Sequence, residues 1–161
     1  MRIGVVSDTH NNLPNVRRIV EIFNEAGVDR VVHTGDITQP KTLEVFADLE
    51  APLFGVFGNN DEERTGLEKA VDKFDFHFVE PPLALEWAGR RLVVVHDPLE
   101  LRGVDESEFD VILHGHTHRQ YIGFDGGRLT FNPGECAGMM QGLNSVGVVC
   151  LRNLDPEIIK F

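Results

Sequence analysis

Short β-rich runs alternate with amphipathic helical patterns through the first half of the chain, and no other feature restricts the fold as strongly. The strand-like runs span residues 3–7, 30–34, 53–57, 92–95 and 111–113. Apolar residues at helical spacing follow the first three runs, over residues 16–23, 43–49 and 67–74. Further on, a hairpin signal at 125–127 separates the runs 121–124 and 129–131, and final strands are expected over 146–151 and 157–160. Early strand–helix alternation followed by late strands predicts an α/β protein with a mixed sheet.

Length and composition are those of an ordinary globular chain. The 161 residues predict a single domain, 1–161, because this length suffices to bury a substantial core. No apolar run approaches the roughly 20 residues of a membrane span, and the apolar stretch in MRIGVVSDTH is too short for a signal peptide. Cys136 and Cys150 are too few for a disulfide framework. We therefore expect a cytoplasmic protein that does not bind membranes.

The chain is strongly acidic, and its charge restricts the class of partner. Lys plus Arg number 15 and Asp plus Glu number 26, which gives a net charge of −11. Such a charge disfavours non-specific binding to nucleic acids and to anionic membranes, so no stable nucleic-acid complex is expected. A phosphorylated small molecule bound at a locally positive site remains compatible with it.

Each of the five strand-like runs in the βα part ends in polar residues that can bind metals. One such ending is best explained as an ordinary turn, because Asp and Asn are common in loops. Five in succession indicate a site, because ligands of open α/β sheets bind at the carboxyl ends of the strands. The endings are Ser7-Asp8-Thr9-His10, Gly35-Asp36, Gly58-Asn59-Asn60-Asp61, His96-Asp97 and His114-Gly115-His116-Thr117-His118.

The candidate ligands outnumber those of one tetrahedral site and suit two ions about 3.5–4 Å apart. Oxygen and imidazole donors without thiolates favour Mn, Fe, Zn or Ni. We expect Asp36 to bridge the ions, because its two carboxylate oxygens can reach both. Two divalent cations, two carboxylates and an assumed bridging hydroxide give 4 − 2 − 1 = +1, a charge that would attract phosphate. The candidates are Asp8, His10, Asp36, Asn59, His96, His116 and His118.

The ordered motifs D-x-H, G-D, G-N-x-D, H and G-H-x-H resemble those of the calcineurin-like metallophosphoesterases. The short length and Asn132-Pro133-Gly134 resemble the small YfcE-like phosphodiesterase branch. The resemblance implies a four-layer αββα sandwich, in which helices flank two mixed β-sheets. It further implies that one metal is held by Asp8, His10, Asp36 and His118, and the other by Asp36, Asn59, His96 and His116.

The resemblance also implies an activity. We expect a phosphodiesterase with two divalent ions, Mn first and Ni, Fe, Zn or Mg as alternatives, and a small phosphodiester as its substrate. A metal-bound hydroxide would attack phosphorus, while Asn60 and the metals would stabilise the added negative charge. The alternative is a non-catalytic interaction module like the retromer subunit of this fold, which the filled ligand positions disfavour. The sequence leaves the oligomeric state open, a homo-oligomer included.

Three positions depart from the family pattern, and three histidines stand outside the ligand set. Asn60 occupies a place where many larger members have histidine, Asp97 one where glycine is usual, and Glu135 one where serine is common. We expect Asp61 and Asp97 either to orient imidazoles or to be solvated. We expect His114 to lie behind the ligands or in the core. We expect His33 and His77 to be structural.

Overall fold

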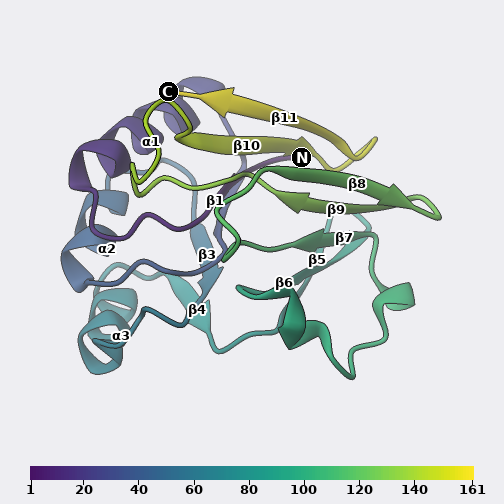
Figure 1. Cartoon of the computed structure of the whole chain (residues 1–161), viewed down its shortest axis with the longest axis horizontal. Helices are drawn as coiled ribbons and strands as arrows, with labels where there is room; N and C mark the ends of the chain where they lie inside the picture. Colours follow the sequence, from purple (N-terminus) through teal and green to yellow (C-terminus); the bar gives the residue numbers. More distant parts are fainter.

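Two β-sheets stack face to face, with three α-helices on one side of the stack (Figure 1). The computed structural model describes all residues from Met1 to Phe161. The first sheet has the strand order β11-β10-β1-β2-β3-β4, and the second has the order β5-β6-β7-β9-β8. Both sheets are mixed, because parallel strands occupy part of each and antiparallel strands complete it.

The first sheet holds most of the predicted strands. Its parallel strands are β1 (Arg2–Val6), β2 (Arg30–His33), β3 (Leu53–Val56) and β4 (His77–Val79). The antiparallel strands β10 (Ser145–Cys150) and β11 (Asp155–Lys160) complete it.

The second sheet is built around three parallel strands, β6 (Arg90–Val94), β7 (Val111–Leu113) and β9 (Arg128–Asn132). The antiparallel strands β5 (Leu83–Trp87) and β8 (Tyr121–Asp125) form its two edges.

The three helices begin and end where local sequence signals place them. In α1 (Leu13–Ala26) the Asn12 side chain accepts the backbone N–H of Asn15, and Gly27 adopts the left-handed conformation that ends many helices. The second helix is α2 (Pro40–Phe46), which starts with proline, and the third is α3 (Arg64–Lys73). None of the helices has the length and hydropathy that a membrane span requires.

Two apolar cores hold the layers together, and β1 contributes to both. Ile3 and Val5 face the second sheet, whereas Val6 packs with the helices, as the alternation of a strand requires. Gly4 lets α1 approach closely, since a Cβ there would lie 2.8 Å from the ring of Phe23. The first sheet is therefore covered on both faces, which fits its nearly continuous apolar strands.

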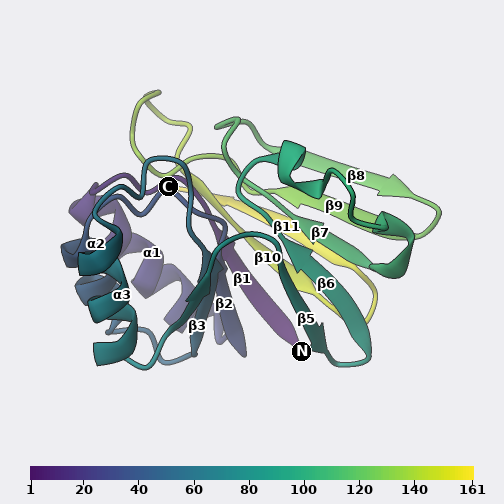
Figure 2. The same cartoon turned by 90° about the horizontal axis from the view of Figure 1, so that it is seen from below.

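The predicted α/β class with two mixed sheets is confirmed, with differences in detail. The layer beyond the second sheet consists of two short 3-10 helices, η1 (Pro98–Leu101) and η2 (Glu106–Glu108), in place of α-helices (Figure 2). Strands β4 and β5 were not predicted: β4 has only three residues, whereas β5 has the alternating burial of an ordinary edge strand. Leu49 lies beyond the end of α2.

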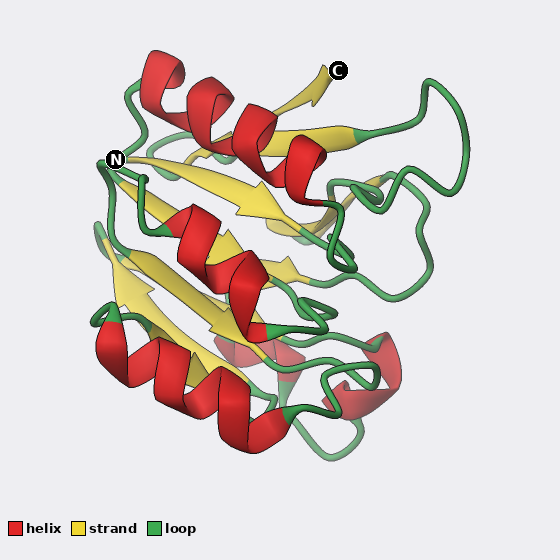
Figure 3. Cartoon of the chain, turned by 90° about the vertical axis from the view of Figure 1, so that its left-hand side faces the viewer, coloured by secondary structure: helices red, strands yellow, loops and turns green.

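The parallel strands of both sheets point toward one end of the molecule. In Figure 3 their arrowheads point to the side where the longest loops gather. The loops after β1, β2, β3, β6 and β7 all leave from this end. The fold therefore brings together the polar endings that the sequence distributes over more than 100 positions.

Candidate metal centre

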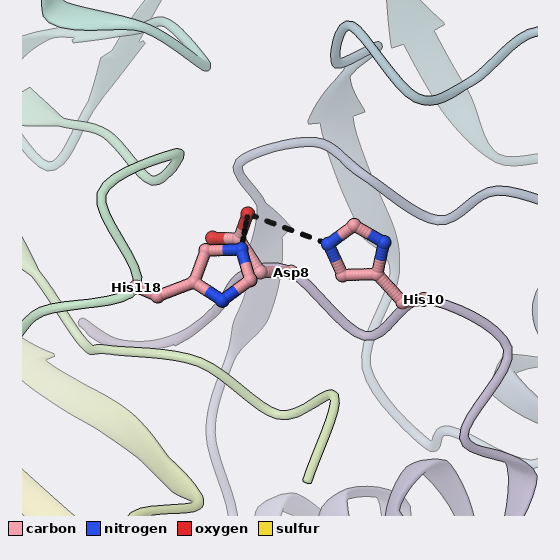
Figure 4. A group of neighbouring side chains, drawn as sticks. All are labelled: Asp8, His10 and His118. Atoms are coloured by element: carbon pink, nitrogen blue, oxygen red, sulfur yellow. Dashed lines mark ion pairs between the residues drawn. The ribbon is translucent and has the colours of Figure 1, made fainter. Parts of the chain in front are cut away.

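All seven predicted ligands meet at this end of the sheets, joined by contacts between their donor atoms. The first group comprises Asp8, His10 and His118, whose donor atoms all lie within 4.8 Å of one another (Figure 4). Asp8 Oδ1 lies 3.3 Å from His118 Nε2 and 3.9 Å from His10 Nε2. Asp8 Oδ1 and His10 Nε2 are buried without any hydrogen-bond partner. Buried polar atoms seldom remain unpaired, so this pair fits a cation.

The Asp8 carboxylate is held so that only one oxygen faces the histidines. Its Oδ2 accepts a hydrogen bond from the Ser7 hydroxyl and another from the backbone N–H of His116 at 3.2 Å. Burial raises the pKa of Asp8, against the lowering effect of the Ser7 hydrogen bond. A cation next to Oδ1 would favour the ionised form of this buried carboxylate.

The second group brings an amide oxygen and two imidazoles together. The Nδ1–H of His96 donates to the carbonyl oxygen of Thr34 at 2.9 Å, so the Nε2 of neutral His96 presents a lone pair. That Nε2 lies 2.9 Å from Asn59 Oδ1 and 3.3 Å from His116 Nδ1. His116 Nδ1 lies 3.1 Å from the same Asn59 oxygen. An electron-rich cluster of this kind suits a cation at its centre.

Asp36 lies between the two groups and directs one oxygen to each. Its Oδ2 lies 3.3 Å from His10 Nε2, and its Oδ1 lies 3.4 Å from His96 Nε2. Two donors bound to one ion at about 2.0–2.2 Å are roughly 3–4 Å apart, so these spacings suit a shared ion on each side. The donor atoms of Asp8, Asp36 and His96 also lie within 4.8 Å of one another, so Asp8 lies near both halves of the centre.

The backbone of the centre adopts an unusual conformation. Positive φ angles between 41° and 65° occur at five of the candidates. Non-glycine residues in this region cost about 1–3 kcal/mol each when the conformation is strained, and such residues concentrate at functional sites. The five candidates are Asp8, His10, Asp36, His116 and His118.

Asp61 fixes the loops that carry Asp36 and Asn59. Its buried carboxylate accepts the backbone N–H groups of Asp36 at 3.1 Å, Thr38 at 2.5 Å and Gly58 at 2.6 Å. Burial raises the pKa of Asp61, against the lowering effect of the hydrogen bonds from Gly58 and Thr38. The expectation that Asp61 orients an imidazole or is solvated was wrong, because backbone amides surround it instead.

Asn60 and Asp97, which depart from the family pattern, also contact the centre. Asn60 donates its backbone N–H to Asp36 Oδ1 at 2.9 Å and its side-chain amide to Oδ2 at 2.7 Å. Asp97 caps η1 by accepting the N–H of Leu99, and its Oδ2 lies 3.6 Å from His116 Nε2.

Glu135 also contacts the centre, and the sequence did not reveal its place there. It is fully buried, and its carboxylate accepts the backbone N–H groups of Ala137 at 2.9 Å and Met140 at 3.1 Å. Its Oε2 also lies 3.8 Å from His118 Nδ1, so it can orient the ring whose Nε2 faces Asp8. The only sequence signal was its place two residues after the Asn-Pro of Asn132-Pro133-Gly134.

The three remaining histidines lie outside the ligand set, as expected. His114 is buried beside Asn132, and burial lowers its pKa. His33 is fully buried, with Nδ1 accepting the N–H of Gly35 and Nε2 facing the Thr9 hydroxyl, each at 3.1 Å. His77 lies exposed on β4.

Comparisons with known proteins find similar sequences along most of the chain. The family profile described as "Calcineurin-like phosphoesterase superfamily domain" matches residues 1–154. "Phosphodiesterase MJ0936" of Methanocaldococcus jannaschii is 32% identical over 154 residues, covering 92% of each chain. "Phosphodiesterase YfcE" of Escherichia coli strain K12 is 27% identical, covering 83% of this chain and 78% of the relative.

Solved structures share the whole fold. A structure described as that of a novel archaeal phosphodiesterase superposes with a TM-score of 0.90 at 30% identity, covering 100% of both chains. Vps29 of Entamoeba histolytica, described as complexed with Zn²⁺, superposes with a TM-score of 0.71 at 17% identity, covering 99% of both chains. At that identity the second likeness shows the fold alone.

Proposed function

Because the chain belongs to the calcineurin-like phosphoesterase superfamily, we propose that it is a phosphodiesterase that depends on two divalent metal ions. The placement of Asp36 supports this proposal most directly, since one oxygen faces His10 and the other faces His96. The unpartnered buried Asp8 Oδ1 and His10 Nε2 fit the same interpretation. Preference for diesters rests on the named activity of the relatives, two of which are phosphodiesterases.

The donors divide into two sets that share Asp36. The first ion would be held by Asp8 Oδ1, His10 Nε2, Asp36 Oδ2 and His118 Nε2. The second would be held by Asp36 Oδ1, Asn59 Oδ1, His96 Nε2 and His116 Nδ1. Four positive charges against two carboxylates leave the centre positive, which explains how a chain of net charge −11 attracts a phosphoester.

We propose manganese as the ion, with nickel, iron, zinc or magnesium as alternatives, because the donors are oxygens and imidazoles. Thiolates do not contribute. The Cys136 thiol is buried and donates to the carbonyl oxygen of Ser145, and burial raises its pKa far above the usual range.

When bound, the ions supply positive charge for the phosphoryl oxygens and an acidified water as the nucleophile. Asn60 orients the Asp36 carboxylate, and the second hydrogen of its side-chain amide is available to a phosphoryl oxygen. An amide does not release a proton at neutral pH, so Asn60 does not protonate the leaving group. Esters of acidic alcohols should therefore be the better substrates.

The alternative function, a non-catalytic interaction module like the retromer subunit of this fold, is less well supported. The fold is shared with Vps29, but here all seven ligand positions hold donor side chains that converge.

We further propose a small soluble phosphodiester rather than a nucleic acid as the substrate, and a cytoplasmic location in which Cys136 and Cys150 remain reduced. A homo-oligomer stays a prediction.

The test is hydrolysis of bis(4-nitrophenyl) phosphate by protein stripped of metal and reloaded with single ions. We expect stripping to abolish hydrolysis, Mn²⁺ to restore it, and the monoester 4-nitrophenyl phosphate to react more slowly. Full activity in stripped protein would overturn the metal requirement. No activity with any ion, despite full metal loading, would favour the interaction role.

A further inference from the structure

A hollow adjoins the metal centre on the outer face of the second sheet. It is a cavity of about 660 Å³ between η1 and β8. Thr117, in its wall, lies between the candidate ligands His116 and His118. Pro98, in the opposite wall, follows Asp97, whose Oδ2 lies 3.6 Å from His116 Nε2. The lining includes Pro98, His114, Thr117, Arg119, Tyr121 and Thr130.

Tyr121 supplies an aromatic surface whose position the strand fixes. It begins β8, an edge strand, and its side chain is about half exposed, at 52%. A Cβ at Gly123 would lie 2.5 Å from the Tyr121 hydroxyl oxygen and 2.8 Å from its ring carbons, so the ring lies along the strand over this glycine. Its centroid lies 6.2 Å from that of His114. Two rings therefore border the cavity.

Arg119 supplies an uncommitted positive charge. It follows His118 directly and lines the cavity, yet its guanidinium forms no ion pair with any carboxylate. Basic residues without an ion pair are common in this chain, so the position of Arg119 carries the argument: a positive charge in the cavity wall, next to His118, favours an anionic or electron-rich ligand. A planar guanidinium can bind phosphate oxygens and can stack on an aromatic ring.

We propose that this cavity binds a planar aromatic substituent of the phosphodiester, such as an aryl group or a nucleobase. This inference rests on the proposed function. The ring of the substituent packs against Tyr121. Arg119, which follows the candidate ligand His118, contacts the phosphate group of the same ligand. The volume lies within the range of about 300–1,000 Å³ that is typical of small-molecule sites. An aliphatic substituent would make no ring contact there and would bind less tightly.

Tyr121 is the only tyrosine in the chain, which allows a direct binding test. Protein with ¹³C-labelled tyrosine rings and diamagnetic Zn²⁺ is titrated with phenylphosphonate and, separately, with methylphosphonate. We expect phenylphosphonate to shift the single tyrosine ring signal and methylphosphonate to leave it nearly unchanged. Equal responses to both ligands would overturn the proposal.

Inhibition of diester hydrolysis by the same two phosphonates gives the second readout. Tyr121→Leu should reduce the preference for phenylphosphonate about three- to tenfold, as expected for the loss of one aromatic contact. Tyr121→Phe should retain it. Phe124→Leu is the matched control, because Phe124 is an exposed aromatic residue of β8 outside the cavity.

The outcomes separate this inference from the proposed function. If diesters are hydrolysed but Tyr121→Leu leaves the inhibitor preference unchanged, the cavity proposal fails and the phosphodiesterase proposal stands. The same conclusion follows if Phe124→Leu lowers the preference as much as Tyr121→Leu does. If no diester is hydrolysed although the ions bind, the proposed function fails, and the tyrosine signal alone decides whether the cavity binds aromatic rings.

Discussion

Mild acid should destabilise the protein through His33, because this buried imidazole has hydrogen-bond partners only for its neutral form. Its Nδ1 accepts the backbone N–H of Gly35, so Nε2 carries the proton and donates to the Thr9 hydroxyl. Protonation of Nδ1 would remove this acceptor and place its hydrogen against the hydrogen of the Gly35 N–H. Burial accordingly lowers the pKa of His33 from 6.5 to about 3.

The direction of the pH effect follows from the two states. In the unfolded chain His33 gains a proton near its ordinary pKa of 6.5, whereas in the folded protein it stays neutral down to about pH 3. Acid therefore favours the unfolded state, and stability is lost as the pH falls below 6.5. At 1.36 kcal/mol per pH unit, the loss between pH 7 and pH 5 is about 2 kcal/mol from this residue alone.

The assay is urea unfolding, followed by the fluorescence of Trp87, at pH 7, 6 and 5 in a chelating buffer, so that metal release does not contribute. The matched variant is His33→Asn, whose Oδ1 can accept the Gly35 N–H but does not titrate. We expect the variant to be less stable at pH 7 and the difference from the original protein to narrow by about 2 kcal/mol at pH 5. A difference that stays constant over this range would refute the buried neutral state of His33.

Two substitutions in the metal centre give further predictions. Gly115→Ala should destabilise the protein by about 1–3 kcal/mol in thermal unfolding and lower its metal content, because the new Cβ would lie 1.9 Å from Ser7 Oγ and 2.9 Å from Asp8 Oδ2; wild-type values for both would contradict the packing. Asn60→His should weaken the dependence of the hydrolysis rate on leaving-group pKa across a series of diesters, if the imidazole reaches the leaving oxygen. A shallow dependence in the original protein would show that another acid already acts.

The metal centre could be predicted because its residues occupy positions that are recognisable in the sequence. Asp8, Asp36 and His96 each follow an apolar strand, and parallel strands end at a common edge. Helix α1 was similarly clear, since Pro14 lies near its start and Gly27 just past its end. In each case the signal lies in neighbouring residues of the sequence. A general rule, the common edge of parallel strands or the capping of helices, then gives the place of those residues in the fold.

The positions of Asp61 and Glu135 could not be predicted, because their roles depend on contacts between distant loops. Asp61 accepts amides from the loop after β2 as well as from its own, and Glu135 approaches His118 from the segment after β9. Strand β5 differs from these residues, because its signals are local: Leu83, Leu85 and Trp87 alternate with more exposed residues, and turn residues flank the strand, so it could have been predicted from the sequence.

Metal content by native mass spectrometry of single-residue variants tests the bridging role of Asp36 most directly. We expect two ions per chain in the original protein, one in Asp8→Asn and in His116→Ala, and almost none in Asp36→Asn, because only Asp36 directs a separate oxygen to each half. Asp8 keeps one oxygen occupied by Ser7 and the His116 amide, which leaves it a single donor. If Asp8→Asn loses both ions while Asp36→Asn retains one, Asp8 is the bridge and the proposed division of ligands is wrong.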